Sequence, residues 1–108
     1  METKPALAAL AALAQESRLA IFRALVAAGP AGLSAGKIGE LIGSTTAVAP
    51  SSLSFHLKEL THAELVSWRQ EGRFVIYAAN FATMNALVAF LTENCCGGEP
   101  CGPVGEPR

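Results

Sequence analysis

Three cysteines near the C-terminus are the residues of this 108-residue chain whose types and spacing point most directly to chemistry. Cys95 and Cys96 are adjacent, and Cys101 follows after Gly97-Gly98-Glu99-Pro100. Neighbouring residues on a regular helix point about 100° apart, so two adjacent thiolates converge on one ion only where the helix gives way. The double glycine supplies that break and lets the chain fold back. We therefore expect Cys95, Cys96 and Cys101 to form one metal or metalloid site.

Soft thiolates select soft ions, and three of them suit trivalent arsenic or antimony, which take three sulfur ligands in a pyramid. A structural Zn²⁺ site usually has four ligands, and the two histidines, His56 and His62, lie in another segment. Cu(I), Cd²⁺ or Zn²⁺ are alternative ions for this site. Two further alternatives are a redox switch in which Cys101 pairs with Cys95 or Cys96, and a tail whose cysteines have no role. No Cys-x-x-Cys motif occurs, so we do not expect a thioredoxin-like enzyme. We also expect no other enzymatic activity and no organic cofactor.

The elements that must carry this site are helices, because apolar residues recur three and four positions apart over most of the chain. We expect helices over about 4–15, from Ser17-Arg18 to Gly29-Pro30, from an N-cap at Ser34 to a C′ glycine at Gly43, over about 51–63, and from a cap at Asn80 to Gly97-Gly98. Their expected buried rows are, in order, Leu7, Leu10 and Leu13; Leu19, Phe22, Leu25 and Val26; Ile38, Leu41 and Ile42; Leu53, Leu57 and Leu60; and Phe81, Met84, Leu87, Val88 and Leu91.

A change of period between the last two helices marks one β-hairpin. Residues 65–69 and 74–78 are rich in β-branched and aromatic side chains, and Gln70-Glu71-Gly72-Arg73 supplies a turn that contains glycine. A short helix, a turn, a second helix and a hairpin in this order are typical of a winged helix-turn-helix. The predicted fold is therefore mainly α with one β-hairpin, with a folded domain over 1–94 and a flexible Cys-, Gly- and Pro-rich tail over 95–108.

Composition and charge exclude several other classes of protein. The chain is 51% hydrophobic and 16% charged, too apolar for a disordered protein, and its length suffices for one small domain. The net charge of −1 gives no bulk basic excess. Residues 5–14 resemble a short signal region and residues 74–92 carry no charge, but the helical and strand periods favour folded elements over both segments. We expect a cytoplasmic protein with reduced thiols and no membrane contact.

The fourth expected helix presents a polar face opposite its leucine row. That face holds Ser51, Ser52, Ser54, Phe55, His56, Lys58 and Glu59. Hydroxyls near a helix N-terminus donate to phosphates or base edges, and an exposed phenylalanine can contact a thymine methyl in the major groove. At the hairpin tip, Arg69, Gln70 and Arg73 would reach the DNA backbone or the minor groove. Lys37 adds a further phosphate contact. The set predicts binding of double-stranded DNA, although each residue taken singly fits an ordinary cap, core or turn position equally well.

The ordered motifs resemble those of ArsR/SmtB-type winged-helix repressors. Residues 13–19 (LAQESRL) are similar to that family's opening motif, residues 52–60 (SLSFHLKEL) to its recognition helix, and residues 63–77 to its wing. The resemblance implies a homodimer, formed through the first and last helices, that represses an operon and leaves its operator DNA when a metal ion or metalloid binds. C-terminal cysteine triplets are one of the arsenite sites of this family. The resemblance thus implies As(III), or alternatively Sb(III), as the inducer at Cys95, Cys96 and Cys101.

Two departures from the family pattern stand out. The loop over residues 44–50 is longer than is usual between the two helices, which affects the entry angle of the recognition helix. The third helix lacks the Cys-Val-Cys pair that many arsenic sensors carry there, so a thiol sensor must lie elsewhere.

Residues 34–77 carry four positive and four negative charges, so we expect a modest salt dependence of DNA binding, with a slope near −5 for about six phosphates neutralised per dimer.

Overall fold

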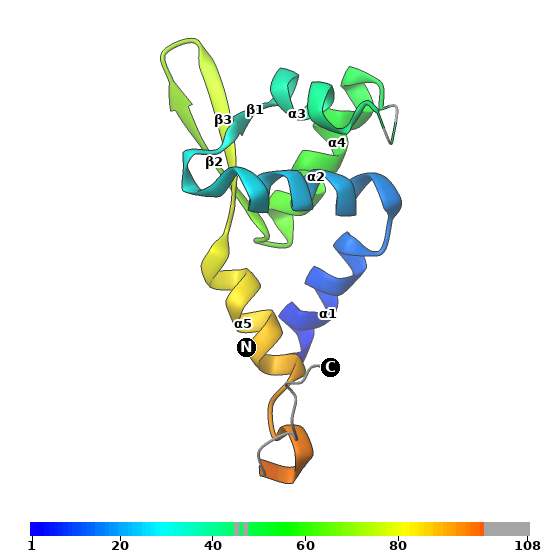
Figure 1. Cartoon of the computed structure of the whole chain (residues 1–108), viewed down its shortest axis with the longest axis vertical. Helices are drawn as coiled ribbons and strands as arrows, with labels where there is room; N and C mark the ends of the chain where they lie inside the picture. Colours follow the sequence, from blue (N-terminus) through cyan, green and yellow to red (C-terminus); the bar gives the residue numbers. More distant parts are fainter. Residues whose placement is uncertain (45, 47, 99–108) are drawn as a thin grey trace.

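The computed structural model of the chain describes residues 1–44, 46 and 48–98 (Figure 1). In chain order its elements are α1 (Thr3–Leu13), α2 (Glu16–Ala28), the 3-10 turn η1 (Gly29–Ala31), β1 (Leu33–Ser34), α3 (Ala35–Ile42), α4 (Pro50–His62), β2 (Val66–Glu71), β3 (Phe74–Ala79), α5 (Phe81–Leu91) and the 3-10 turn η2 (Cys95–Gly98). This order confirms the predicted winged helix-turn-helix fold. Within the described residues, no helix is long and apolar enough to cross a membrane.

The sheet has three antiparallel strands in the order β1-β3-β2. The hairpin closes at Glu71 paired with Phe74, so its tip is the two-residue turn Gly72-Arg73, with Gly72 at a φ of +61°. Glycine adopts this left-handed conformation without a steric penalty. Strand β1 was not predicted, because two residues are too short to show a periodic pattern. It pairs Leu33 with Tyr77 and so fastens the hairpin to the start of α3.

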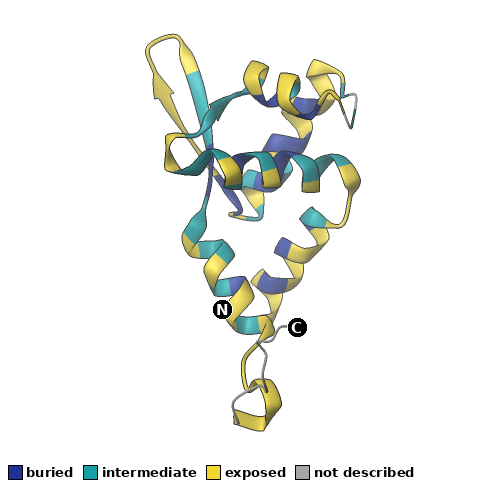
Figure 2. Ribbon diagram, viewed as in Figure 1, coloured by how far each residue is buried: buried dark blue, intermediate teal, exposed yellow. Residues whose placement is uncertain are grey.

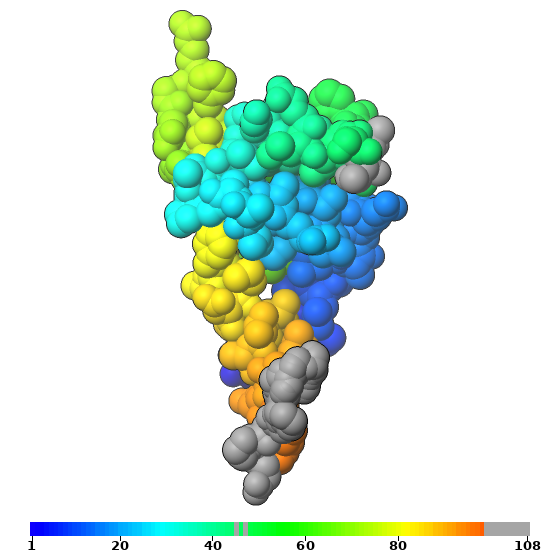
Figure 3. Space-filling view, viewed as in Figure 1, coloured from blue at the N-terminus to red at the C-terminus, as the bar shows by residue number. Residues whose placement is uncertain are grey.

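The helix α2 crosses the middle of the molecule and separates two ends (Figure 1). On one side of it lie α3, α4 and the β2–β3 hairpin, and on the other side α1 and α5 extend away and converge. In the space-filling view the hairpin stands clear of the surface of α3 as a separate projection (Figure 3). The two ends are therefore joined through α2 and the residues packed around it.

The core gathers around α2 (Figure 2). Ile21 and Leu25 of α2 are fully buried, as are Leu57 and Leu60 of α4 and Ile38 of α3. Two caps start the helices as predicted, since Ser34 accepts from the Lys37 backbone N–H and Asn80 accepts from that of Thr83. The cap of α2 lies earlier than expected, because Gln15 accepts from the Arg18 backbone N–H and the helix begins at Glu16.

Several expected buried positions are wrong. Helix α1 buries Ala6, Ala9 and Ala12 rather than its leucines, because small side chains let it approach the body closely, and Leu7 and Leu10 face outward. Leu19, Leu41, Val88 and Leu91 are also exposed, and Ile21 takes the place expected for Leu19. Gly43 has a φ of −62°, so it is not a left-handed C′ residue.

Helix α5 is shorter than predicted. It ends at Leu91, and Thr92 is its C-cap. The Thr92 hydroxyl donates to the carbonyl of Val88 at 2.9 Å, and Asn94 follows with a φ of +59°. Because asparagine tolerates the left-handed conformation that stops a helix, the helix ends well before Gly97-Gly98.

Candidate nucleic-acid interface and thiol pair

The exposed face of α4 matches most of the prediction made for it. Pro50 occupies the first helical turn, where its missing N–H costs no hydrogen bond. The predicted residues Ser51, Ser52, Ser54, Phe55 and Lys58 are all exposed. Phe55 is 51% exposed and so offers an apolar surface on an otherwise polar face. Three hydroxyls and one ammonium beside a helix N-terminus make a surface that favours anions.

The predicted exposure of His56 is wrong. The side chain is only 8% exposed, because it lies three residues from Leu53 and four from Leu60 and therefore shares their face. Its Nδ1 accepts a hydrogen bond of 3.2 Å from Nε of Arg18 on α2. Burial lowers the pKa of His56, and the positive charge of Arg18 lowers it further. The ring is therefore held neutral, as an acceptor for Arg18.

Arg18 is a functional candidate that sequence reasoning treated only as part of a motif. Besides donating to His56, its guanidinium lies over the Phe55 ring, 5.6 Å from the ring centre. This is within the range of a cation–π contact. One side chain of α2 thus contacts two consecutive residues of α4, one buried and one on the exposed face.

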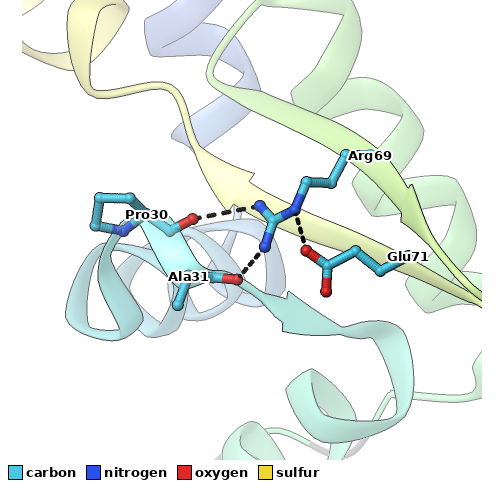
Figure 4. A network of polar contacts seen from close by, with 4 residues as sticks. All are labelled: Pro30, Ala31, Arg69 and Glu71. Carbon is cyan, nitrogen blue, oxygen red and sulfur yellow. Dashed lines mark hydrogen bonds and ion pairs between the residues drawn. The ribbon is translucent and has the colours of Figure 1, made fainter.

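Adjacent residues of β2 point to opposite faces of the hairpin, which separates the predicted contacts Arg69 and Gln70. The guanidinium of Arg69 turns toward η1, where it donates to the carbonyls of Pro30 at 3.3 Å and Ala31 at 2.8 Å (Figure 4). Its Nε also donates to the Glu71 carboxylate at 2.6 Å. Arg69 therefore ties the hairpin to the body and does not extend from the tip as we expected.

The other predicted DNA contacts differ in their surroundings. Lys37 lies 3.6 Å from the Glu40 carboxylate, in an exposed pair on α3. Gln70 donates to the Gly72 carbonyl at 3.2 Å and so braces the turn. Arg73 is exposed at the tip itself. Of the three predicted hairpin residues, only Arg73 lies where it could contact the DNA backbone as predicted.

The cysteines lie farther from α5 than predicted. Residues 92–94 separate them from the helix, and Cys95 and Cys96 belong to η2. Cys96 has a φ of +56°, and this break in the helix brings the two sulfurs to 3.7 Å from each other. Cys95 is disulfide-bonded in this structure. Two sulfurs that bind one ion at about 2.3 Å lie at most about 4.6 Å apart, so the distance suits a shared ligand in the reduced form of the protein. Among residues 1–44, 46 and 48–98, no group of three potential ligand residues converges, and Cys101 lies outside the described residues.

The chain is similar to known proteins along most of its length. A family model described as a helix-turn-helix domain matches residues 13–67. HlyU from Vibrio cholerae N16961 is 30% identical, with a TM-score of 0.65 over 89% of this chain and 99% of that one. An ArsR-like transcriptional regulator from Rhodococcus sp. RHA1 is 27% identical, with a TM-score of 0.66 over 82% of this chain and 76% of that one.

A third solved structure has the same fold at lower identity. It is the homodimeric winged helix-turn-helix DNA-binding domain (fragment 1–100) of Mb0332 from Mycobacterium bovis, a possible ArsR-family transcriptional regulator. It is 24% identical, with a TM-score of 0.63 over 91% of this chain and 87% of that one. No curated protein sequence matches the chain significantly.

Proposed function

Because the chain belongs to the ArsR family of winged helix-turn-helix transcriptional regulators, we propose that it is a DNA-binding repressor that leaves its operator when trivalent arsenic binds. The exposed face of α4 is the observation that carries DNA binding. It places Ser51, Ser52, Ser54 and Lys58 on the outside of a helix whose other side is packed into the core. Such a helix enters the major groove of DNA, while the tip of the hairpin reaches the adjacent minor groove. The proposal includes no catalytic step.

The protein acts as a homodimer in this proposal. Four large apolar side chains, Leu7 and Leu10 of α1 and Val88 and Leu91 of α5, are each between 39% and 59% exposed. Both helices lie at the end of the molecule away from α3 and the hairpin tip, and α1 packs against both α5 and α4. A second copy seated there would bury these side chains and present two copies of α4 to one duplex, about 34–36 Å apart. The homodimeric state of the Mycobacterium bovis neighbour supports this arrangement.

The inducer in this proposal is As(III), or Sb(III), held by Cys95, Cys96 and Cys101 in the cytoplasm. The 3.7 Å separation of the first two sulfurs supports a shared thiophilic ligand once Cys95, which is disulfide-bonded in this structure, is reduced. Residues 92–94 link them to α5, which carries Val88 and Leu91 of the dimer surface. A ligand that binds the DNA-incompetent state better by ~1–3 kcal/mol weakens operator binding about 5- to 150-fold.

A mobility-shift titration tests the proposal. The probe is a duplex from the region directly upstream of the protein's own gene, and a scrambled duplex of equal length is the control. We expect a shift of the upstream duplex that arsenite reverses. Failure to shift either duplex would refute DNA binding, and a shift that arsenite leaves unchanged would refute the inducer alone.

Thiol oxidation and another soft ion are the second candidates. The short distance between Cys95 and Cys96 suits Cu(I) or Cd²⁺ as well, and clustered thiols are also typical of redox sensors. The same titration separates them. Release by copper or cadmium but not arsenite identifies another metal sensor, and release by peroxide that dithiothreitol reverses identifies a redox sensor.

A further inference from the structure

A hollow of about 300 Å³ lies between α4 and the hairpin. Ser54, Lys58, Thr61 and His62 of α4 form one wall, and Trp68 of β2 and Tyr77 of β3 form the other. Trp68 and Tyr77 are paired across the two strands, so they stand side by side on the hairpin face that is turned toward α4. Arg69, the next residue along β2, occupies the opposite face.

The side chains around this hollow suit a polyanion with apolar parts. Lys58 brings a full positive charge, and Ser54, Tyr77 and the indole of Trp68 bring neutral hydrogen-bond donors. Thr61 already donates its hydroxyl hydrogen to the Leu57 carbonyl at 2.8 Å. None of the six lining residues is acidic. The hollow therefore combines donors and a cation with broad aromatic carbon surfaces.

Trp68 exposes a large aromatic surface to water, which is energetically unfavourable. It is the one tryptophan of the sequence, and 58% of it is accessible. A large exposed aromatic at the rim of a donor-lined hollow is typical of a binding surface. Sequence reasoning used Trp68 only as a strand former. Its spacing of two from Val66, which the structure shows to be buried, places both side chains on the same face of β2.

The shape of duplex DNA supplies the occupant. A sugar-phosphate strand separates each major groove from the adjacent minor groove, so a protein with α4 in one and the hairpin tip over the other must straddle that strand. We propose that the hollow between α4 and the hairpin binds this strand, with Lys58 on a phosphate and Trp68 packed against deoxyribose. This inference rests on the proposed DNA binding and adds Trp68 and Tyr77 to the residues that carry it.

The fluorescence of Trp68 tests the inference, because no other tryptophan contributes to the emission. The full chain is titrated with the upstream duplex while emission and acrylamide quenching are followed. We expect the emission to change in step with the mobility shift and the quenching constant to fall at least about twofold. Inorganic phosphate at the same phosphate concentration should change neither quantity.

Each contrary result has a separate meaning. A mobility shift with unchanged emission and quenching overturns the hollow as the strand site and leaves DNA binding intact. The absence of any shift overturns DNA binding and this inference together. A full response to inorganic phosphate alone would make the hollow a pocket for small anions and would also overturn the inference.

A matched pair of variants adds an energetic test. Phe74 is an equally exposed aromatic of the same hairpin, 64% accessible, and alternation along β3 places it on the face opposite Tyr77. Because aromatic anchors contribute more than about 1.4 kcal/mol at interfaces, Trp68→Ala should weaken binding of the duplex about tenfold. Phe74→Ala should leave it within about twofold. Equal losses of affinity in both variants, with melting temperatures unchanged, would contradict the assignment.

Discussion

The two ends of this molecule differ in the chemistry they expose. The end built from α3, α4 and the hairpin presents hydroxyls, cations and single aromatics on elements that α2 holds in place. The end built from α1 and α5 presents leucines, a valine and, beyond α5, two adjacent cysteines. Polar donors that face water match a polyanion, whereas exposed leucines match a second copy of the same surface. On this basis we propose that DNA binds at one end and that dimerisation and sensing belong to the other.

The largest effect is expected from charge placed on the α1 and α5 surface. Leu7→Glu combined with Leu91→Glu should give a monomer, because carboxylates would be buried without partners. Loss of the second copy removes bivalent binding, so affinity for the upstream duplex should fall about 100-fold or more. Sedimentation velocity and mobility shift measure the two quantities.

Leu41→Glu is the control for this pair. Leu41 is 50% exposed, but it belongs to α3 at the other end. The variant should remain a dimer, with at most a change in DNA affinity. A monomeric Leu41→Glu protein, or a dimeric double variant, would contradict the division between the two ends.

Replacing the thiols should separate sensing from DNA binding. Cys95→Ser, Cys96→Ser and Cys101→Ser should each bind the upstream duplex like the unaltered chain. They should lose the arsenite effect, expected to be about 5- to 150-fold in the unaltered protein. A mobility-shift titration with arsenite measures both. Variants that still release DNA normally would place the sensor elsewhere.

Arg69 and Arg73 should differ although they belong to one hairpin. Arg73→Ala should weaken binding and reduce the salt slope by about 1 for each phosphate that is no longer neutralised. Arg69→Ala should weaken binding by about tenfold or less with the slope unchanged, because Arg69 orients the hairpin through Pro30 and Ala31. Fluorescence anisotropy at several salt concentrations gives both quantities.

Glu71→Gln decides the role of Arg69. If Arg69 bound phosphate, removal of its carboxylate partner would release the guanidinium and raise DNA affinity. If Arg69 holds the hairpin, the substitution removes part of that support and affinity should fall or stay constant. A clear gain in affinity would restore Arg69 as a DNA-binding residue.

The smallest effect is a pH dependence from His56. Because the folded protein lowers the pKa of His56 below its ordinary value of 6.5, the unfolded chain binds more protons near that pH. The stability contribution is complete above pH 6.5 and is lost as the pH falls below it. His56→Gln keeps an acceptor for Arg18 without titrating. Its urea midpoint should therefore fall less on acidification than that of the unaltered chain, and parallel curves would refute the effect.

The sequence predicted what local patterns determine. The apolar period located α4, the Gly-containing turn located the hairpin, and Ser34 and Asn80 marked helix starts correctly. It failed where a distant partner decides. The alanines of α1 are buried because the body approaches closely, and Arg69 turns inward because two carbonyls of η1, about 38 residues earlier, accept its hydrogen bonds. His56 was predictable from its spacing to Leu53 and Leu60, but its polarity was given more weight than its position.

Hydrogen exchange of the full chain, free and with the upstream duplex, tests the division between the two ends most directly. We expect DNA to slow exchange in the first turn of α4 and along β2 and β3, because these segments of the protein approach the sugar-phosphate strand of the DNA. Exchange in α1 should not change, because the proposed second copy would cover it in both states. Protection confined to α1 and α5, with α4 and the hairpin unaffected, would contradict the account.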